Sequence, residues 1–403
     1  MTFKNTPNKG EIDSNWGINS SNWDHPSHLA LSQRHMDKMM PVRYLQPGQT
    51  IDLPRAELPL DLEALPLHDP LTGKPMAAND FLNRRLFNDA CMVVHRGQVL
   101  HESYRNGMRP EDHHVQHSTT KSLIAMLVGI AIAENKVSPD IEVAEYIPEL
   151  RILPAWQGVT LQHVLDMATG IEYSEDYADP NCPYFSYAQA VGYAGELSEA
   201  RIGHKAWMLQ HMTSRSSEPG AQFCYTSPLT NVLGMVISVA YDRDFLDVLE
   251  EKIYCRIGAE AQAWFNTDDF GVAIAEGQLS LRLRDFARWA LLMINGGKNL
   301  LGEQVLPPEF IADTLTVRES SKEAFAKSAD AAYFPGAQYR NQFWVLSPEQ
   351  QQYAMLGIHG QTVWYDQRQE LMILGYGSYP VQDDALLFAA WQQLNAAILT
   401  AVR

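Results

Sequence analysis

One segment of this 403-residue chain is apolar around its whole circumference, and it limits what the chain can fold into. Between about Ser118 and Asn135, apolar residues occupy every side of a helix rather than one stripe. Such a helix is stable only where other elements surround it, so we expect it at the centre of the fold. Its apolar run, from Leu123 to Ala133, is shorter than the roughly 20 residues that cross a bilayer. The sequence therefore predicts a globular protein without a membrane span.

Strand patterns occur on both sides of this helix. The runs CMVVH and VLHESYR flank Arg96-Gly97-Gln98 and predict a hairpin. Residues from about 140 to 270 are typical of helices and loops. Towards the C-terminus the sequence predicts helices near Leu281–Ile294 and Pro308–Leu315, the strands FWVLS, YAMLGI, QTVWYD and ELMILGYG, and a last helix over Asp384–Thr400. We therefore expect an α/β (α+β) fold, with an antiparallel sheet from both chain ends, flanking helices and an inserted, mostly helical domain.

Proline marks a separate segment at the N-terminus. Nine prolines lie before about residue 80, a density that blocks helix interiors and strand ladders. We expect an irregular arm over residues 1–80 that packs on the core through Trp16 and Trp23, with a disordered tail as the alternative. The predicted domains are then an α/β domain over 81–135 and 270–403, and a helical domain over 136–269.

Charge and cysteine content narrow the function. The formal net charge is −17, from 31 basic and 48 acidic residues, which disfavours a nucleic-acid partner and suits a neutral or cationic small molecule. The four cysteines are scattered without a C-x-x-C pair, so zinc-ribbon and redox sites have no support. The N-terminus is polar and lacks a signal-peptide core, which predicts a cytoplasmic protein. We leave a homodimer open.

The strongest chemical motif is Ser118-Thr119-Thr120-Lys121 at the start of the central helix. Residues three apart share a helix face, so the Lys121 amine can reach the Ser118 hydroxyl and, when neutral, take its proton. The helix N-terminus adds amide donors that favour an oxyanion. Chance gives on the order of 0.6 such spacings in a chain of this composition, and a plain capping serine is the alternative. The position of the motif favours catalysis.

Two other segments are candidates for the same site. Tyr225 could share a proton with a lysine, and Ser227 could hold that lysine in place, although a tyrosine packed at a helix start is the alternative. Around Gly357 and Gly360, close approach of the backbone could complete an oxyanion hole, although a β-bulge with a satisfied histidine is equally consistent. The acidic run Glu172–Asp179 has no glycine at the position of an EF-hand turn and reads as a polar loop.

From about residue 88 to the end, the chain resembles the serine β-lactamase and penicillin-recognising superfamily. The resemblance depends on landmarks in a fixed order: the hairpin, STTKSLIAMLVGIAIAENK, LQHVLDMATGI, PGAQFCYTSPLTNVLG, EGQLSLRLRDFARWALLMINGGK and GIHGQTVWYDQRQELMILGYG. Within the superfamily it is most similar to the nylon-oligomer (6-aminohexanoate-dimer) hydrolases. GIEYSEDYADP and GIHGQTVWYDQ carry this closer similarity.

The resemblance implies a role for several residues of this chain. Ser118 would be the nucleophile, and its amide would face the Ile358 amide across the oxyanion. The remaining implied roles are Lys121 and Tyr225 as the proton-handling pair, Tyr177 at the scissile amide nitrogen, Trp344 in the acyl pocket, and Glu276 and His359 as further substrate-binding residues.

Departures from the family pattern bear on the substrate. The chain has no K-T-G triad, so we do not expect β-lactamase activity. Ala188 falls where active nylon-dimer hydrolases carry an aspartate that holds the substrate amine, and Glu276 falls near one of their asparagines and could supply a carboxylate instead. The prediction is a serine hydrolase of small amides or esters that needs no metal or cofactor. A carboxylesterase with little amidase activity and a catalytically silent ligand-binding relative are the alternatives.

Overall fold

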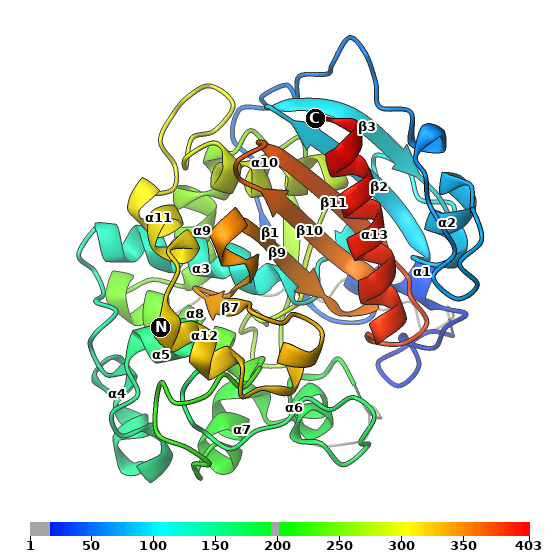
Figure 1. Cartoon of the computed structure of the whole chain (residues 1–403). Coiled ribbons are helices and arrows are strands. Elements are labelled where there is room, and N and C mark those ends of the chain that lie inside the picture. The colour runs from blue at the N-terminus through cyan, green and yellow to red at the C-terminus, as the bar shows by residue number, and fades with distance from the viewer. Residues whose placement is uncertain (1–16, 195–200) are drawn as a thin grey trace.

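A seven-stranded antiparallel sheet forms the largest layer of the molecule (Figure 1). The computed structural model describes residues 17–194 and 201–403, so the predicted anchor Trp16 lies outside the described residues. The strand order is β3-β2-β11-β10-β9-β8-β7, which confirms the predicted sheet built from both chain ends. The strands are β2 (Asn88–His95), β3 (Gln98–Tyr104), β7 (Gln338–Arg340), β8 (Phe343–Ser347), β9 (Gln352–Gly357), β10 (Gln361–Asp366) and β11 (Leu371–Gly377).

Strands β2 and β3 form the predicted hairpin. His95 pairs with Gln98, so the loop is only Arg96 and Gly97. Both loop residues have positive φ, 49° and 74°, as in the type I′ turn that matches the twist of a tight hairpin.

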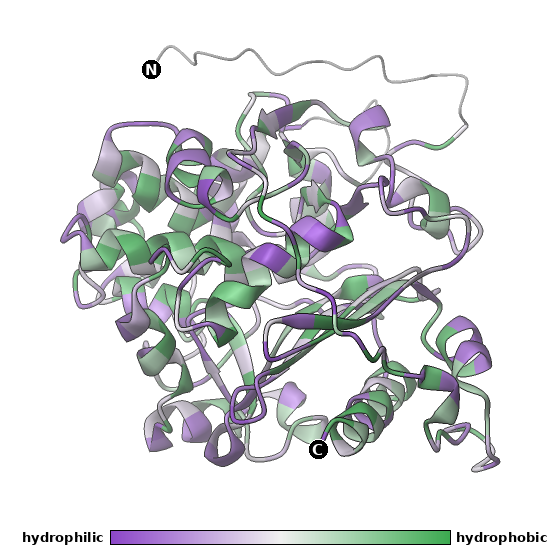
Figure 2. Ribbon diagram, turned by 90° about the horizontal axis from the view of Figure 1, so that it is seen from above, coloured by the Kyte–Doolittle hydropathy of each residue, from purple (hydrophilic) through white to green (hydrophobic). Residues whose placement is uncertain are grey.

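Helices cover both faces of this sheet, as Figure 2 shows from above. On one face, α13 (Ala385–Ala401) packs against apolar side chains of β2, β10 and β11, among them Trp364. On the other face, α3 (Thr119–Ala133) contacts β9 and β10, and α10 (Leu283–Ile294) contacts β2 and β11. Every residue of α3 from Thr119 to Ala131 is buried, which confirms the predicted central helix.

A helical layer lies beyond α3. Its longest member, α8 (Pro228–Tyr241), packs along α3 and has proline at a position where the missing amide hydrogen costs nothing. The other helices are α1 (Leu29–Ser32), α2 (Ala78–Arg84), α4 (Val143–Tyr146), α5 (Leu161–Leu165), α6 (Pro183–Val191), α7 (Gly203–His211), α9 (Phe245–Lys252), α11 (Pro308–Leu315) and α12 (Glu319–Phe325).

A second, four-stranded sheet was absent from the predictions. Its order is β1-β5-β6-β4, with β1 (Val42–Leu45), β4 (His114–Val115), β5 (Ala263–Asn266) and β6 (Leu279–Leu281). Strands of two to four residues are too short to show an alternating pattern. One strand comes from the N-terminal arm, so the arm contributes regular structure there. The domain boundaries stay a prediction.

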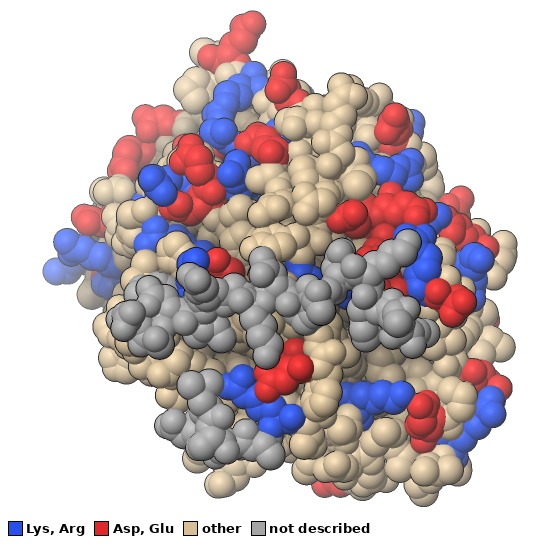
Figure 3. Space-filling model, turned by 180° about the vertical axis from the view of Figure 1, so that it is seen from behind, with Lys and Arg blue, Asp and Glu red and all other residues tan. Residues whose placement is uncertain are grey.

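The arm is attached to the core where the structure describes it. Trp23 is 4% exposed, and its indole Nε1 donates to the Tyr193 carbonyl at 2.7 Å. Within the described ranges, no helix has the length and apolarity that crossing a membrane requires. On the face seen in Figure 3, basic and acidic side chains are interspersed, and the basic ones do not merge into one large patch.

Candidate active site

The N-terminus of α3 brings the serine and lysine of the motif together. Lys121 Nζ donates to Ser118 Oγ at 2.7 Å and to the Glu276 carbonyl at 2.7 Å, and lies 3.4 Å from Glu276 Oε2. Lys121 is only 1% exposed. Burial lowers the pKa of Lys121, and the charges of Glu276 and Glu175 oppose this shift. The amine is therefore placed to exchange a proton with the serine hydroxyl.

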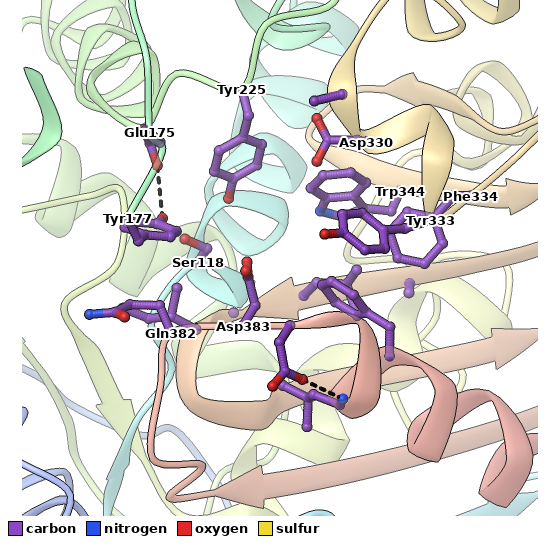
Figure 4. Close-up of a pocket in the computed structure, with 18 of the residues that line it drawn as sticks. Ser118, Glu175, Tyr177, Tyr225, Asp330, Tyr333, Phe334, Trp344, Gln382 and Asp383 are labelled. Atoms are coloured by element: carbon purple, nitrogen blue, oxygen red, sulfur yellow. Dashed lines mark hydrogen bonds between the residues drawn. The ribbon is translucent and has the colours of Figure 1, made fainter. Parts of the chain in front are cut away.

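Tyr225 lies beside the serine, in the loop before α8 (Figure 4). Its ring stacks on Trp344, with centroids 5.4 Å apart, and its centroid lies 5.3 Å from Lys121 Nζ. Burial raises the pKa of Tyr225 well above its ordinary value, while a hydrogen bond with Ser118 opposes the rise. A neutral phenol in this position can donate a proton to a group that leaves from the serine.

Strand β9 ends beside the serine amide. A Cβ atom on Gly357 would lie 2.9 Å from the Gln116 carbonyl oxygen and 3.0 Å from the Ser118 nitrogen, so the absence of a side chain permits the approach. In the described part of the chain, the Ser118 amide donates to no acceptor. Ile358 follows Gly357 and lines the same cavity as Ser118. This arrangement is compatible with an oxyanion hole of two amides.

A cavity of about 970 Å³ opens from Ser118. Aromatic side chains form much of its wall, and two carboxylates, Asp330 and Asp383, point into it (Figure 4). Burial raises the pKa of Asp383 to about 6, with the charges of Asp330 and Asp384 adding to the effect. The predicted residues Tyr177, Tyr225, Trp344 and Ile358 also line this cavity. Sequence reasoning missed the two aspartates, because Asp330 lies in a short 3-10 helix (Ala329–Ala332) and Asp383 in the loop before α13, and neither segment carries a motif.

Glu175 is a third residue that the sequence did not single out. Its carboxylate accepts hydrogen bonds from the amide and hydroxyl of Ser227 and, at 3.0 Å, from the Tyr177 hydroxyl. Burial raises the pKa of Glu175 to about 7, and the charge of Lys121 opposes the rise. The sequence offers Ser227 as a group that could hold the lysine, but its side-chain hydrogen bond goes to Glu175. Instead, it holds the loop that carries Tyr177.

Glu276 lies behind the lysine rather than in the large cavity. It is 4% exposed, and its carboxylate accepts from the Tyr193 hydroxyl at 3.0 Å. It borders a second cavity of about 10 Å³, which Ser118 and Gln278 also line. Ala188 is fully buried and lines neither cavity. Glu276 thus contacts Lys121 directly, and any contact with substrate would have to come through the smaller cavity.

His359 does not take the predicted substrate-binding position. Its side chain is 1% exposed, its Nδ1 pairs with the Tyr379 carbonyl at 2.8 Å, and its ring packs near Trp23 and His117. It lines neither cavity. The backbone explains the placement, because φ of 61° at His359 turns the chain between β9 and β10. Across residues 17–194 and 201–403, no group of three His, Cys, Asp or Glu side chains is arranged to hold a metal ion.

Comparison with known proteins agrees with this geometry. Residues 78–394 match the β-lactamase family. The chain is 30% identical over 352 residues to the 6-aminohexanoate-dimer hydrolase of Paenarthrobacter ureafaciens, which covers 84% of this chain and 87% of that protein.

Solved structures show the same fold. A Bacillus anthracis chain with the provisional name 6-aminohexanoate-dimer hydrolase superposes with a TM-score of 0.84 at 23% identity, covering 99% of both chains. A D-stereospecific amidohydrolase from Streptomyces superposes with a TM-score of 0.57 at 17% identity, covering 79% of this chain and 97% of that one. The chain therefore belongs to the β-lactamase family and is a serine hydrolase with that fold.

Proposed function

We propose that this protein cleaves small linear amides or esters through an acyl-enzyme on Ser118. The observation that carries the proposal is the buried Lys121 amine, 2.7 Å from the Ser118 hydroxyl at the wall of a cavity of about 970 Å³. Burial disfavours the charged form of an amine, and a neutral amine at this distance can accept the hydroxyl proton.

The steps follow from the positions of the side chains. Ser118 Oγ attacks the substrate carbonyl carbon as its proton passes to Lys121 Nζ, and the amides of Ser118 and Ile358 stabilise the oxyanion. Tyr225 then donates its proton to the leaving nitrogen or oxygen as that bond breaks, and Lys121 returns a proton to Tyr225. Water then attacks the carbonyl carbon of the acyl-enzyme. The same proton transfers run in reverse, and the acid is released from Ser118.

The chemistry of the cavity wall supports the substrate class. Asp330 and Asp383 make the cavity acidic, which suits a neutral or cationic substrate better than an anionic one. The curated relative is named for an amide with these properties, the 6-aminohexanoate dimer. We therefore place linear amides with a free amine first among the candidates, and simple esters second.

Hydrolysis of p-nitrophenyl butyrate by the wild type and by Ser118→Ala tests the proposal, with circular dichroism to check that both are folded. We expect activity in the wild type and its loss in the variant. An amide panel that begins with the linear 6-aminohexanoate dimer then separates an amidase from a carboxylesterase, which would cleave only the esters. An inactive wild type would favour the silent binding relative, and an active Ser118→Ala would show that the nucleophile is another residue.

We further propose, from the sequence alone, that the protein acts in the cytoplasm. Cell fractionation tests this location. Light scattering on the purified protein tests the homodimer that the sequence leaves open.

A further inference from the structure

Two histidines flank the candidate oxyanion hole. His117 directly precedes Ser118, and His359 directly follows Ile358. Both histidines have a left-handed backbone, with φ of 44° at His117 and 61° at His359. A residue other than glycine adopts this conformation at a cost in free energy, and the conformation persists where the surrounding structure fixes it. The contacts of the two imidazoles therefore affect where the neighbouring amides point.

The two imidazoles pack against each other and against one indole. The ring centroids of His117 and His359 are 5.7 Å apart. Trp23 stacks on His117, with centroids 5.6 Å apart and an interplanar angle of 27°, and it meets His359 edge-on at 6.0 Å. These separations lie within the range of favourable contacts between aromatic rings. We call Trp23, His117 and His359 the ring cluster.

The ring cluster is buried and lies close to the nucleophile. Trp23 and His117 border the small cavity beside Glu276, and both residues of the candidate oxyanion hole line the same cavity. Burial lowers the pKa of both imidazoles, which favours neutral rings near the Lys121 amine. The ring cluster therefore adds packing next to the oxyanion hole without adding a positive charge.

Trp23 belongs to the N-terminal arm, and hydrogen bonds fix both its side chain and its backbone. Its indole Nε1 donates to the Tyr193 carbonyl at 2.7 Å. Its own carbonyl accepts from the Ser32 hydroxyl at 2.7 Å, and its amide donates to the Asn19 carbonyl at 3.0 Å. The indole is thus a fixed surface against which the imidazoles pack. Among the described residues, His117 Nε2 has no hydrogen-bond partner, so ring contacts take a larger share in holding that imidazole.

We propose that Trp23 is a positioning residue for the oxyanion hole. Its indole holds the two imidazoles of the ring cluster, and these hold the Ser118 and Ile358 amides at the reacting carbonyl. The proposal rests on the proposed function, because it needs an oxyanion that forms on attack by Ser118. It makes part of the N-terminal arm a component of the active site.

Two substitutions at Trp23 isolate the contribution of the ring. Trp23→Leu and Trp23→Phe both lose the hydrogen bond to Tyr193, but only phenylalanine keeps an aromatic ring against the imidazoles. We expect Trp23→Leu to lower kcat for p-nitrophenyl butyrate by about 10–100-fold, because a small displacement of oxyanion donors is costly. KM should stay nearly unchanged, since the oxyanion exists only around the transition state. Trp23→Phe should keep most of the wild-type kcat.

Leu45→Ala is the matched control for lost packing of the arm. Leu45 lies in β1 of the same arm, is 1% exposed and lines neither cavity. Urea denaturation measures the stability of each variant. If Leu45→Ala lowers kcat as much as Trp23→Leu does, or if Trp23→Phe is as impaired as Trp23→Leu, the proposal is wrong. If Trp23→Leu does not fold, Trp23→Met takes its place, because methionine adapts to irregular space without supplying a ring.

Hydrogen–deuterium exchange separates this proposal from the catalytic one, because it needs no turnover. The backbone amides of the turn between β9 and β10, residues 357–361, should exchange faster in Trp23→Leu than in the wild type, Trp23→Phe or Leu45→Ala. If the wild type hydrolyses no ester but the variants show this pattern, the ring cluster holds the turn and the proposed function fails. If exchange in the turn is unchanged in Trp23→Leu, the proposal is overturned whether or not the enzyme is active.

Discussion

Ser227 Oγ lies 2.9 Å from Glu175 Oε2, and this hydrogen bond ties the loop that precedes α6 to the N-terminus of α8. The same carboxylate accepts from the Ser227 amide and from the Tyr177 hydroxyl. Figure 4 shows the dashed contact between Glu175 and Tyr177 next to Ser118. Glu175 therefore positions Tyr177 at the serine without needing to touch substrate.

This role should appear in the pH dependence of activity. Burial raises the pKa of Glu175 to about 7, so below that pH the group carries a proton and accepts fewer hydrogen bonds. We expect kcat/KM for p-nitrophenyl butyrate to fall as the pH drops through about 7. Glu175→Gln, which cannot titrate, should have lower activity and lack this part of the profile. An unchanged profile in Glu175→Gln would assign the titration to another group, such as Lys121.

Variants of Lys121 and Glu276 should show separate effects on turnover and on the free energy of unfolding. Lys121→Met removes the proposed base and should lower turnover by about a hundredfold or more. It also leaves the Glu276 carboxylate, which is 4% exposed, without its cation, at a cost of about 3–5 kcal/mol in the free energy of unfolding. Urea denaturation measures the cost. The double variant Lys121→Met/Glu276→Gln should regain most of the stability and none of the activity. Recovery of activity in the double variant would exclude Lys121 as the base.

Gly357 should tolerate no side chain, for reasons of space alone. In Gly357→Ala, the new methyl group would lie within 3.0 Å of the Ser118 amide and the Gln116 carbonyl, so β9 must move away from the serine. If the Ser118 and Ile358 amides form the oxyanion hole, kcat should fall by a factor of about 10²–10³. Gly277→Ala is the matched control, since its nearest contact, at 3.5 Å, is ordinary. Similar losses in both variants would argue against a specific role for the β9 terminus.

The sequence could predict the elements whose patterns are local. Helix α11 has the predicted bounds, Pro308–Leu315, and strands β8 and β10 coincide with the predicted runs FWVLS and QTVWYD. Each of them is long enough to show its own period. Strand β4 has two residues, and only its partner β6 makes it a strand, so no local pattern could reveal it.

In the candidate site, too, local spacing predicts some contacts, and others arise only when the chain folds. Ser118 and Lys121 are three residues apart on one helix, and this spacing alone places them in contact. Glu175 and Ser227 are 52 residues apart, and Asp330 and Asp383 come from a short 3-10 helix and a separate loop, so only the folded chain brings each pair into the site. The resemblance to a family supplied Tyr177 and Trp344 in the same cavity. It did not supply the orientation of His359, which a positive φ turns away from the cavity.

Gln342 provides a test of what holds the site's scaffold together. It is 1% exposed, and its side chain accepts from the Thr230 hydroxyl of α8 at 2.8 Å and donates to the Leu165 carbonyl of α5 at 3.0 Å. Its own carbonyl accepts from the Ser122 hydroxyl of α3, so one residue links three helices to the strand pair β7–β8.

Gln342→Leu should leave the Thr230 hydroxyl buried without this acceptor and remove the side-chain donor of the Leu165 carbonyl, which keeps the Gln342 backbone amide at 2.9 Å. We expect the free energy of unfolding to fall by about 1–3 kcal/mol. Gln351→Leu is the control. Gln351 has a similar positive φ, 58° against 62°, and in the described part of the chain its hydrogen bonds come from its backbone, which Leu would keep. Urea denaturation of both variants separates the hydrogen bonds from the backbone strain. Equal destabilisation would mean that the left-handed backbone, rather than the links to α5 and α8, is the sensitive feature. A larger loss of stability in Gln342→Leu than in Gln351→Leu would show that the side-chain amide of Gln342 holds the scaffold together.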